Sequence, residues 1–147
     1  MGDVMNIDKK VLDLLLKNAE RAYKKGEIPV SAVVLDQSGK IISSSFNNRQ
    51  NKYNVLGHAE INAILKAEKK IRDWRLDGYS MIVTLEPCNM CSMIIKEARL
   101  DKVFYFLPKK NDNDSWEISI EKEQLKEYKD YSSKFKQLLT VFFDNKR

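Results

Sequence analysis

The stretch TLEPCNMC at residues 84–91 joins the end of one expected element to the start of another and contains both cysteines of the chain. The short run from Tyr79 to Thr84 is rich in strand-forming residues. Pro87 suits the first turn of a helix, and the apolar residues that follow recur at helical spacing: Cys91, Ile94, Ile95 and Ala98. We therefore expect a strand, a tight turn and a helix, with both cysteines near the helix start.

A second stretch, HAE at residues 58–60, contains the only histidine of the chain. It lies at the start of a helix that we expect to run from His58 to about Ile71. One imidazole and two cysteine sulfurs are zinc-type donors, and three protein ligands leave the fourth tetrahedral position for water, as in catalytic sites. We predict that His58, Cys88 and Cys91 hold one Zn²⁺ per chain.

Each motif alone has an ordinary explanation. A lone histidine at a helix start is usually a cap or a surface residue, and Cys-x-x-Cys can be a redox pair or two buried small side chains. Together, however, His-x-Glu and Pro-Cys-x-x-Cys form the signature of zinc deaminases. Glu60, two positions after His58, could reach the same site without being a ligand and accept a proton from water. Glu60 is therefore the predicted catalytic acid and base.

The rest of the chain alternates helices and strands. We expect a helix over residues 8–24 with Gly26 just past its end, and a hairpin formed by Val30–Leu35 and Lys40–Phe46. A strong strand follows at Lys102–Leu107, a half-buried one at Trp116–Ile120, and a final amphipathic helix contains, among others, Leu125, Tyr128, Phe135 and Phe142. This order predicts an α/β fold with a sheet covered on both faces.

Length and composition indicate one folded domain over residues 1–147. Hydrophobic residues make up 43% and charged residues 32%, a balance typical of globular proteins rather than disordered ones. The longest apolar run, Val103 to Leu107, is far shorter than the roughly 20 residues of a membrane span, and no secretory signal precedes it, so we expect a cytoplasmic protein without membrane association. The net charge of +5 is spread along the chain and permits a nucleic-acid partner without requiring one.

With GEIPVSAVV at residues 26–34, the two motifs resemble the cytidine deaminase-like superfamily and, within it, the bacterial tRNA-specific adenosine deaminases. The resemblance implies a three-layer α/β/α fold with a mixed five-stranded sheet and helices on both faces. It also implies a homodimeric, zinc-dependent hydrolase that deaminates adenosine to inosine at the wobble position, in the anticodon loop of a tRNA. Asn47, eleven residues before His58, matches the family's base-binding asparagine, with Asn48 as the rival.

Other functions stay open on the same residues. Deaminases of free nucleobases or nucleosides, of the cytosine, guanine or cytidine type, carry both motifs as well. A non-catalytic zinc scaffold would have no use for Glu60 beside an open ligand position. A thiol redox protein would instead join Cys88 to Cys91 in a disulfide and bind no metal.

The chain departs from the family after the fourth expected strand, where FLPKK at residues 106–110 replaces a Gly-Ala step and a Gly-rich stretch. A parallel connection needs about a dozen residues or more, and Pro108 to Ser115 offers fewer. We therefore expect Trp116–Ile120 to run antiparallel to its neighbour. Lys109 and Lys110 lie at the end of a sheet where ligands generally bind. Two readings stay open for them: they contact phosphates, or they belong to a solvated surface loop.

Overall fold

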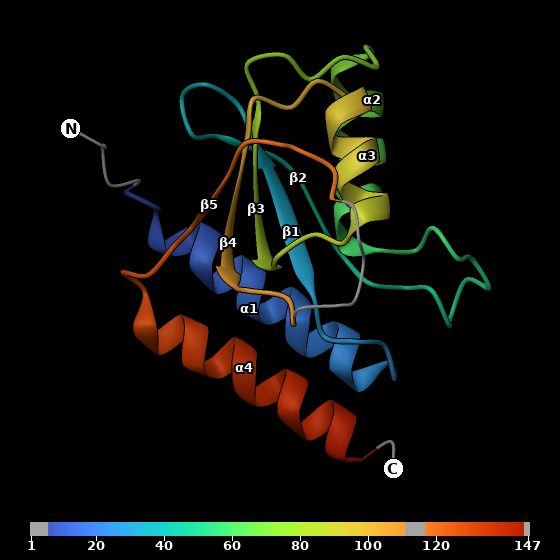
Figure 1. Ribbon diagram of the computed structural model, residues 1–147, viewed down its shortest axis with the longest axis vertical. Helices are drawn as coiled ribbons and strands as arrows, with labels where there is room; N and C mark the ends of the chain where they lie inside the picture. Colours follow the sequence, from blue (N-terminus) through green and yellow to red (C-terminus); the bar gives the residue numbers. More distant parts are fainter. Residues whose placement is uncertain (1–5, 111–116, 146–147) are drawn as a thin grey trace.

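The computed structural model describes residues 6–110 and 117–145, which form nine elements (Figure 1). In chain order these are α1 (Lys9–Lys24), β1 (Ser31–Leu35), β2 (Ile41–Phe46), α2 (Ala59–Ile71), β3 (Ser80–Leu85), α3 (Asn89–Glu97), β4 (Lys102–Leu107), β5 (Lys122–Gln124) and α4 (Lys129–Asp144). Across these described ranges, no helix combines the length and the apolar character needed to cross a lipid bilayer.

The strands form one sheet in the order β2-β1-β3-β4-β5. β1 is antiparallel to both β2 and β3, whereas β3, β4 and β5 run parallel to one another. Helices α2 and α3 cover one face, and α1 and α4 cover the other (Figure 1). The expected three-layer α/β/α arrangement with a mixed five-stranded sheet is confirmed.

The two faces of the sheet contribute to separate cores because side chains alternate along a strand. In β1, Ala32 and Val34 pack under α2 and α3, while Val33 and Leu35 pack against α1. The α1 side also contains an edge-to-face aromatic pair, Phe106 and Phe135, with ring centroids 5.1 Å apart. This pair packs α4 against β4, and residues at the end of the same helix line the cavity beside His58.

Local signals set most boundaries where they were expected. Asp8 begins α1 by accepting a hydrogen bond from the Lys10 backbone N–H at 2.9 Å. Gly26, just past the helix, has a φ of 78°, which favours glycine. Pro87 was expected in the first turn of α3 but precedes it, because Cys88 is the N-cap. The final helix begins only at Lys129, so the segment from Leu125 to Tyr128 precedes it.

The expectation for the last strand is wrong in both place and direction. Trp116 lies outside the described residues, residues 117–120 belong to no strand, and β5 occupies Lys122–Gln124. β5 pairs with β4 in parallel, with Val103 opposite Lys122. Because the strand starts later than expected, residues 108–121 connect it to β4, and this length satisfies the dozen residues that a parallel crossover requires.

Candidate metal and base-binding site

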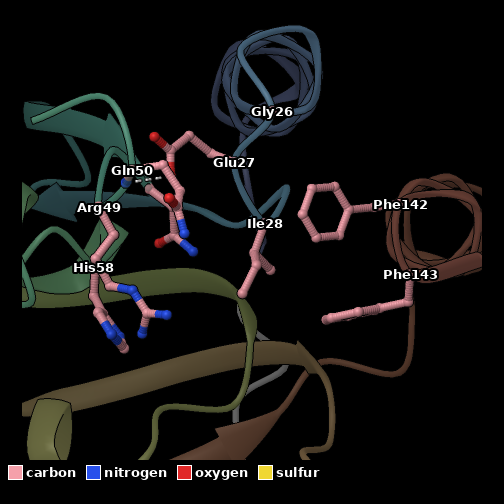
Figure 2. Close-up of a pocket in the computed structure, with 9 residues that line it drawn as sticks. Gly26, Glu27, Ile28, Arg49, Gln50, His58, Phe142 and Phe143 are labelled. Atoms are coloured by element: carbon pink, nitrogen blue, oxygen red, sulfur yellow. Dashed lines mark hydrogen bonds between the residues drawn. The ribbon is translucent and has the colours of Figure 1, made fainter. Parts of the chain in front are cut away.

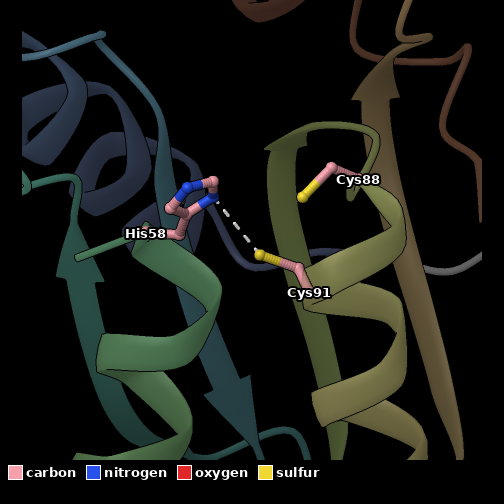
Figure 3. Close-up of side chains that lie close together, drawn as sticks. All are labelled: His58, Cys88 and Cys91. Carbon is pink, nitrogen blue, oxygen red and sulfur yellow. Dashed lines mark hydrogen bonds between the residues drawn. The ribbon is translucent and has the colours of Figure 1, made fainter. Parts of the chain in front are cut away.

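Three donor side chains meet where α2 and α3 begin (Figure 3). His58 is the N-cap of α2, Cys88 is the N-cap of α3, and Cys91 lies in the first turn of α3. One ligand atom from each residue lies within 4.8 Å of the other two, and Cys91 Sγ is 3.4 Å from His58 Nδ1. The structure thus brings together the three residues that the sequence predicted as ligands.

The donor set fits zinc. Two sulfurs and one imidazole are ligands that tetrahedral Zn²⁺ accepts, and both helix N-termini favour negative charge on the sulfurs. Cys88 and Cys91 are free thiols. A hydrogen bond from Cys91 lowers the pKa of the Cys88 thiol to about 3 and raises the pKa of Cys91. The lowered pKa favours the thiolate form of Cys88, the form in which a cysteine binds a metal ion.

Glu60 lies beside these donors in the first turn of α2 and is 4% exposed. Burial raises the pKa of its carboxyl from 4.5 to about 7, although the nearby His58 favours the charged form. A carboxyl group with a pKa near neutrality can both accept and return a proton at physiological pH. Its position and its protonation equilibrium therefore suit acid–base chemistry next to a metal site.

Asn47 closes the start of α2 from outside the helix. Within the described part of the chain neither His58 nor Cys88 uses its side chain to cap its own helix, so both remain available as donors. Instead Asn47 Oδ1 accepts the Ala59 backbone N–H at 2.7 Å. The rival residue, Asn48, points elsewhere and accepts from Asn62 Nδ2 at 2.9 Å.

A cavity of about 490 Å³ opens beside His58 (Figure 2). Asn47 and His58 line it together with residues that the sequence analysis did not assign to the site: Gly26, Glu27, Ile28, Arg49, Gln50, Phe142 and Phe143. Figure 2 shows the two rings projecting from α4 towards Ile28, across the cavity from Arg49 and His58. The volume of the cavity lies in the range of small-molecule sites. Polar groups line one wall of the cavity, and aromatic rings line the other.

Glu27 holds the loop that forms the polar wall. Its carboxylate accepts the backbone N–H of Gln50 at 3.1 Å and that of Asn51 at 2.7 Å, and Asn51 Nδ2 at 2.5 Å. Burial opposes the charge, but the donors from Asn51 and Gln50 outweigh it and hold the pKa of Glu27 below its ordinary 4.5. Glu27 stood in the sequence only as part of the GEIPVSAVV stretch, and its partners lie more than 20 positions away, so no local pattern indicated this role.

Comparison with known proteins agrees with this geometry. Residues 5–107 match the family described as the cytidine and deoxycytidylate deaminase zinc-binding region. The chain is 50% identical over 91 residues to the tRNA-specific adenosine deaminase of Rickettsia bellii, across 61% of this chain and 63% of that relative. The chain thus spans less than two thirds of that relative's length.

Two solved structures are similar in fold and sequence. One comes from biochemical and structural studies of A-to-I editing by tRNA:A34 deaminases at the wobble position of transfer RNA. It superposes with a TM-score of 0.76 at 25% identity, covering 90% of this chain and all of the other. The second, guanine deaminase from Bacillus subtilis, gives a TM-score of 0.63 at 33% identity, covering 71% of this chain and 66% of the other.

The donor cluster predicts about one zinc ion per purified chain. Cys91→Ser should abolish zinc binding, because it removes one of three protein ligands, whereas Met93→Ala, at a half-exposed position of the same helix, should retain it. Elemental analysis after gel filtration measures both. Full zinc content in Cys91→Ser, or a Cys88–Cys91 disulfide in active metal-free protein, would contradict the assignment.

The hydrogen bonds that the Glu27 carboxylate accepts from Gln50 and Asn51 predict that removing its charge changes the stability of the protein by an amount that depends on pH. Because its pKa is lowered in the folded state, the carboxylate stabilises the fold above its ordinary pKa of 4.5, and this contribution disappears as pH falls through the folded-state value. Glu27→Gln should therefore lower the free energy of unfolding at pH 7 and have a shrinking effect below about pH 4.5. Denaturant unfolding at several pH values, with the exposed Glu20→Gln as control, measures this. A difference independent of pH would refute it.

Proposed function

The chain belongs to the cytidine and deoxycytidylate deaminase family, and we propose that it is a hydrolase that converts adenosine to inosine at the wobble position of a tRNA. The observation that carries the proposal is the meeting of His58, Cys88 and Cys91 with the buried Glu60 at the start of two helices. The choice of substrate is supported by the relatives, which include a tRNA-specific adenosine deaminase and a structure from work on tRNA:A34 deaminases.

In this proposal Glu60 moves the protons. When His58, Cys88 and Cys91 hold zinc, the ion would lower the pKa of a water molecule, so that the water becomes a nucleophile near neutral pH. Glu60 accepts the proton that this water loses and delivers it to N1 of the adenine ring. The water oxygen bonds to C6, Glu60 carries the second proton of that water to the amino group, and the C6–N bond breaks so that the group leaves as ammonia. Water is consumed, ammonia is released, and inosine remains.

Asn47 orients the base. Its Oδ1 is occupied by the Ala59 N–H, so the hydrogens that the side chain offers to a ligand are those on Nδ2. They can bind an acceptor on the purine ring. Phe142 and Phe143 on the opposite wall of the cavity offer ring faces against which a base extruded from its stack can pack. The cavity then holds the base between a polar and an aromatic wall.

A second cavity, of about 660 Å³, supports an RNA substrate over a free base. Phe143 lines both cavities, so the second one lies next to the first. Leu107 and Leu139 contribute apolar surface, and Lys110 and Lys136 add two exposed positive charges. Apolar surface beside lysines matches a nucleotide, which has a flat base and a charged phosphate.

The surroundings of Lys109 argue against the phosphate contact suggested by its place in the sequence. It also lines the second cavity, but its side chain is only 19% exposed and its Nζ lies 3.9 Å from Glu117 Oε1. An ammonium group already beside a carboxylate is a weaker phosphate ligand than a free one. We therefore assign phosphate contacts to Lys110 and Lys136 rather than to the pair Lys109 and Lys110.

We also propose a cytoplasmic homodimer. Free thiols at Cys88 and Cys91 suit a reducing compartment, where tRNA is also found. The loop between β2 and α2 exposes three apolar side chains, Tyr53 at 96%, Val55 at 69% and Leu56 at 44%, and adjacent exposed apolar groups mark protein interfaces. Burial of this loop against a second copy accounts for the exposure, and sedimentation at the monomer mass of 17.1 kDa would contradict it.

Deamination of a free nucleobase is the second candidate, because the Bacillus subtilis guanine deaminase structure is 33% identical to this chain.

The zinc-loaded protein should produce inosine in an arginine tRNA with an ACG anticodon, detected by nucleoside chromatography. It should release no ammonia from free adenine, cytosine or guanine. Ammonia from a free base without inosine in the tRNA would favour the second candidate.

Glu60→Gln should lower the deamination rate by roughly 10²–10⁴-fold, the contribution of one acid–base group, while zinc content and thermal stability are retained. Glu68→Gln makes the same change two turns further along α2 and should leave the rate close to that of the unchanged protein. Single-turnover assays with saturating enzyme separate the chemical step from binding. A Glu60→Gln variant of normal rate would remove this residue from the mechanism.

If Lys110 and Lys136 contact two phosphates, replacing both by alanine should weaken tRNA binding and reduce the slope of log affinity against log salt by about 1.4 to 1.8. Lys17→Ala with Lys24→Ala removes the same charge from exposed positions of α1 and should leave the slope unchanged. Filter binding over a range of salt concentrations measures both. Equal effects of the two double variants would show that only net charge matters.

A further inference from the structure

The segment before β5 reaches back to the turn that carries Cys88. It lies beyond residue 107, where the match to the family ends, and Figure 1 shows it in orange beside α3 on its way to the sheet edge. Ile118 donates its backbone N–H to Asn89 Oδ1 at 3.3 Å. Asn89 directly follows Cys88, so this bond attaches the segment to one side of the metal-binding turn.

Glu86 is the second point of attachment, two residues before Cys88. Its backbone N–H donates to the Leu107 carbonyl at 2.8 Å, and its Oε1 accepts the Lys109 backbone N–H at 3.2 Å. Its Oε2 accepts Lys122 Nζ. The side chain of Glu86 is 11% exposed and that of Lys122 is 19% exposed. A largely buried ion pair therefore joins the first residue of β5 to the end of β3.

Glu117 completes the cluster by accepting Lys122 Nζ at 3.1 Å. Two lysines, Lys109 and Lys122, and two glutamates thus share one site with no net charge. Burial lowers the pKa of Lys122, but the hydrogen bonds to Glu86 and Glu117 outweigh it and hold that pKa above its ordinary value. Lys122 is therefore charged at neutral pH. Removing its charge would leave the largely buried carboxylate of Glu86 without its ionic partner.

We propose that Lys122, through Glu86, is a positioning residue that holds the Cys88 turn in place for the metal. Metal ligands act only within a few tenths of an ångström of their proper distances, and partners outside the ligand shell maintain those positions. Cys88 is itself an N-cap, so its sulfur follows the path of the backbone on either side of it. Glu86 fixes one side of that path and Asn89 the other. The inference rests on the zinc site of the proposed function.

The test compares zinc release from the loaded protein to an excess of chromogenic chelator. Lys122→Met, which keeps the side-chain length but removes the charge, should release zinc about 10–100-fold faster than the unchanged protein. Lys122→Arg, which retains a donor for Glu86, should restore slow release. Lys102→Met is the matched control, because it breaks a different ion pair of β5, the one between Lys102 in β4 and Glu123 at 2.7 Å, without touching the Cys88 turn.

All rates are measured below the unfolding midpoint of each variant, so that a general loss of stability does not register as zinc release. If Lys122→Met does not fold, Glu86→Gln should show the same acceleration. Release within twofold of the unchanged rate, or equal acceleration by Lys102→Met, overturns the proposal. Failure of the unchanged protein to bind zinc would overturn the proposed function as well, whereas normal zinc retention in Lys122→Met overturns this inference alone.

Discussion

The site depends on one constraint, namely that α2 and α3 begin close enough together for side chains at their first residues to meet. The first residues of α2 and α3 bring an imidazole and two sulfurs within 4.8 Å, and each N-terminus lowers the cost of negative charge there. The side chains of His58 and Cys88 are N-caps in position but leave their own helices uncapped in the described structure. Asn47 satisfies the first N–H of α2 instead, so capping and ligand binding are divided between two residues.

The sheet order produces this meeting. β1 and β3 are neighbours, and each is linked to one of the two site helices, β1 through β2 to α2 and β3 directly to α3. The same arrangement places the polar loop that Glu27 holds beside His58, and the end of α4 opposite it. The cavity therefore has one wall from each half of the chain: the polar wall comes from residues before α2, and the aromatic wall comes from the end of α4.

Buried charge marks the places where position matters most. Glu60 is buried with a raised pKa, Glu27 is buried with a lowered one, and Glu86 is paired with Lys122. A buried carboxylate is costly unless donors surround it. Glu27 and Glu86 have such donors and fix loops on either side of the site, whereas Glu60 has a raised pKa because burial dominates, and this makes it able to exchange a proton.

The sequence by itself determined the local features: the first helix with the glycine just past its end, the hairpin, and the spacing that puts Cys88 and Cys91 at one helix start. These follow from interactions between residues a few positions apart. Only the tertiary structure decided the rest. β5, with the polar sequence KEQ at 122–124, is an edge strand whose direction follows from pairing with β4 and not from its own pattern. The hydrogen bonds of Glu27 and Glu86 likewise join residues more than 20 positions apart, and so does the cavity that Phe142 and Phe143 share with His58. No short-range pattern specifies which distant groups will meet.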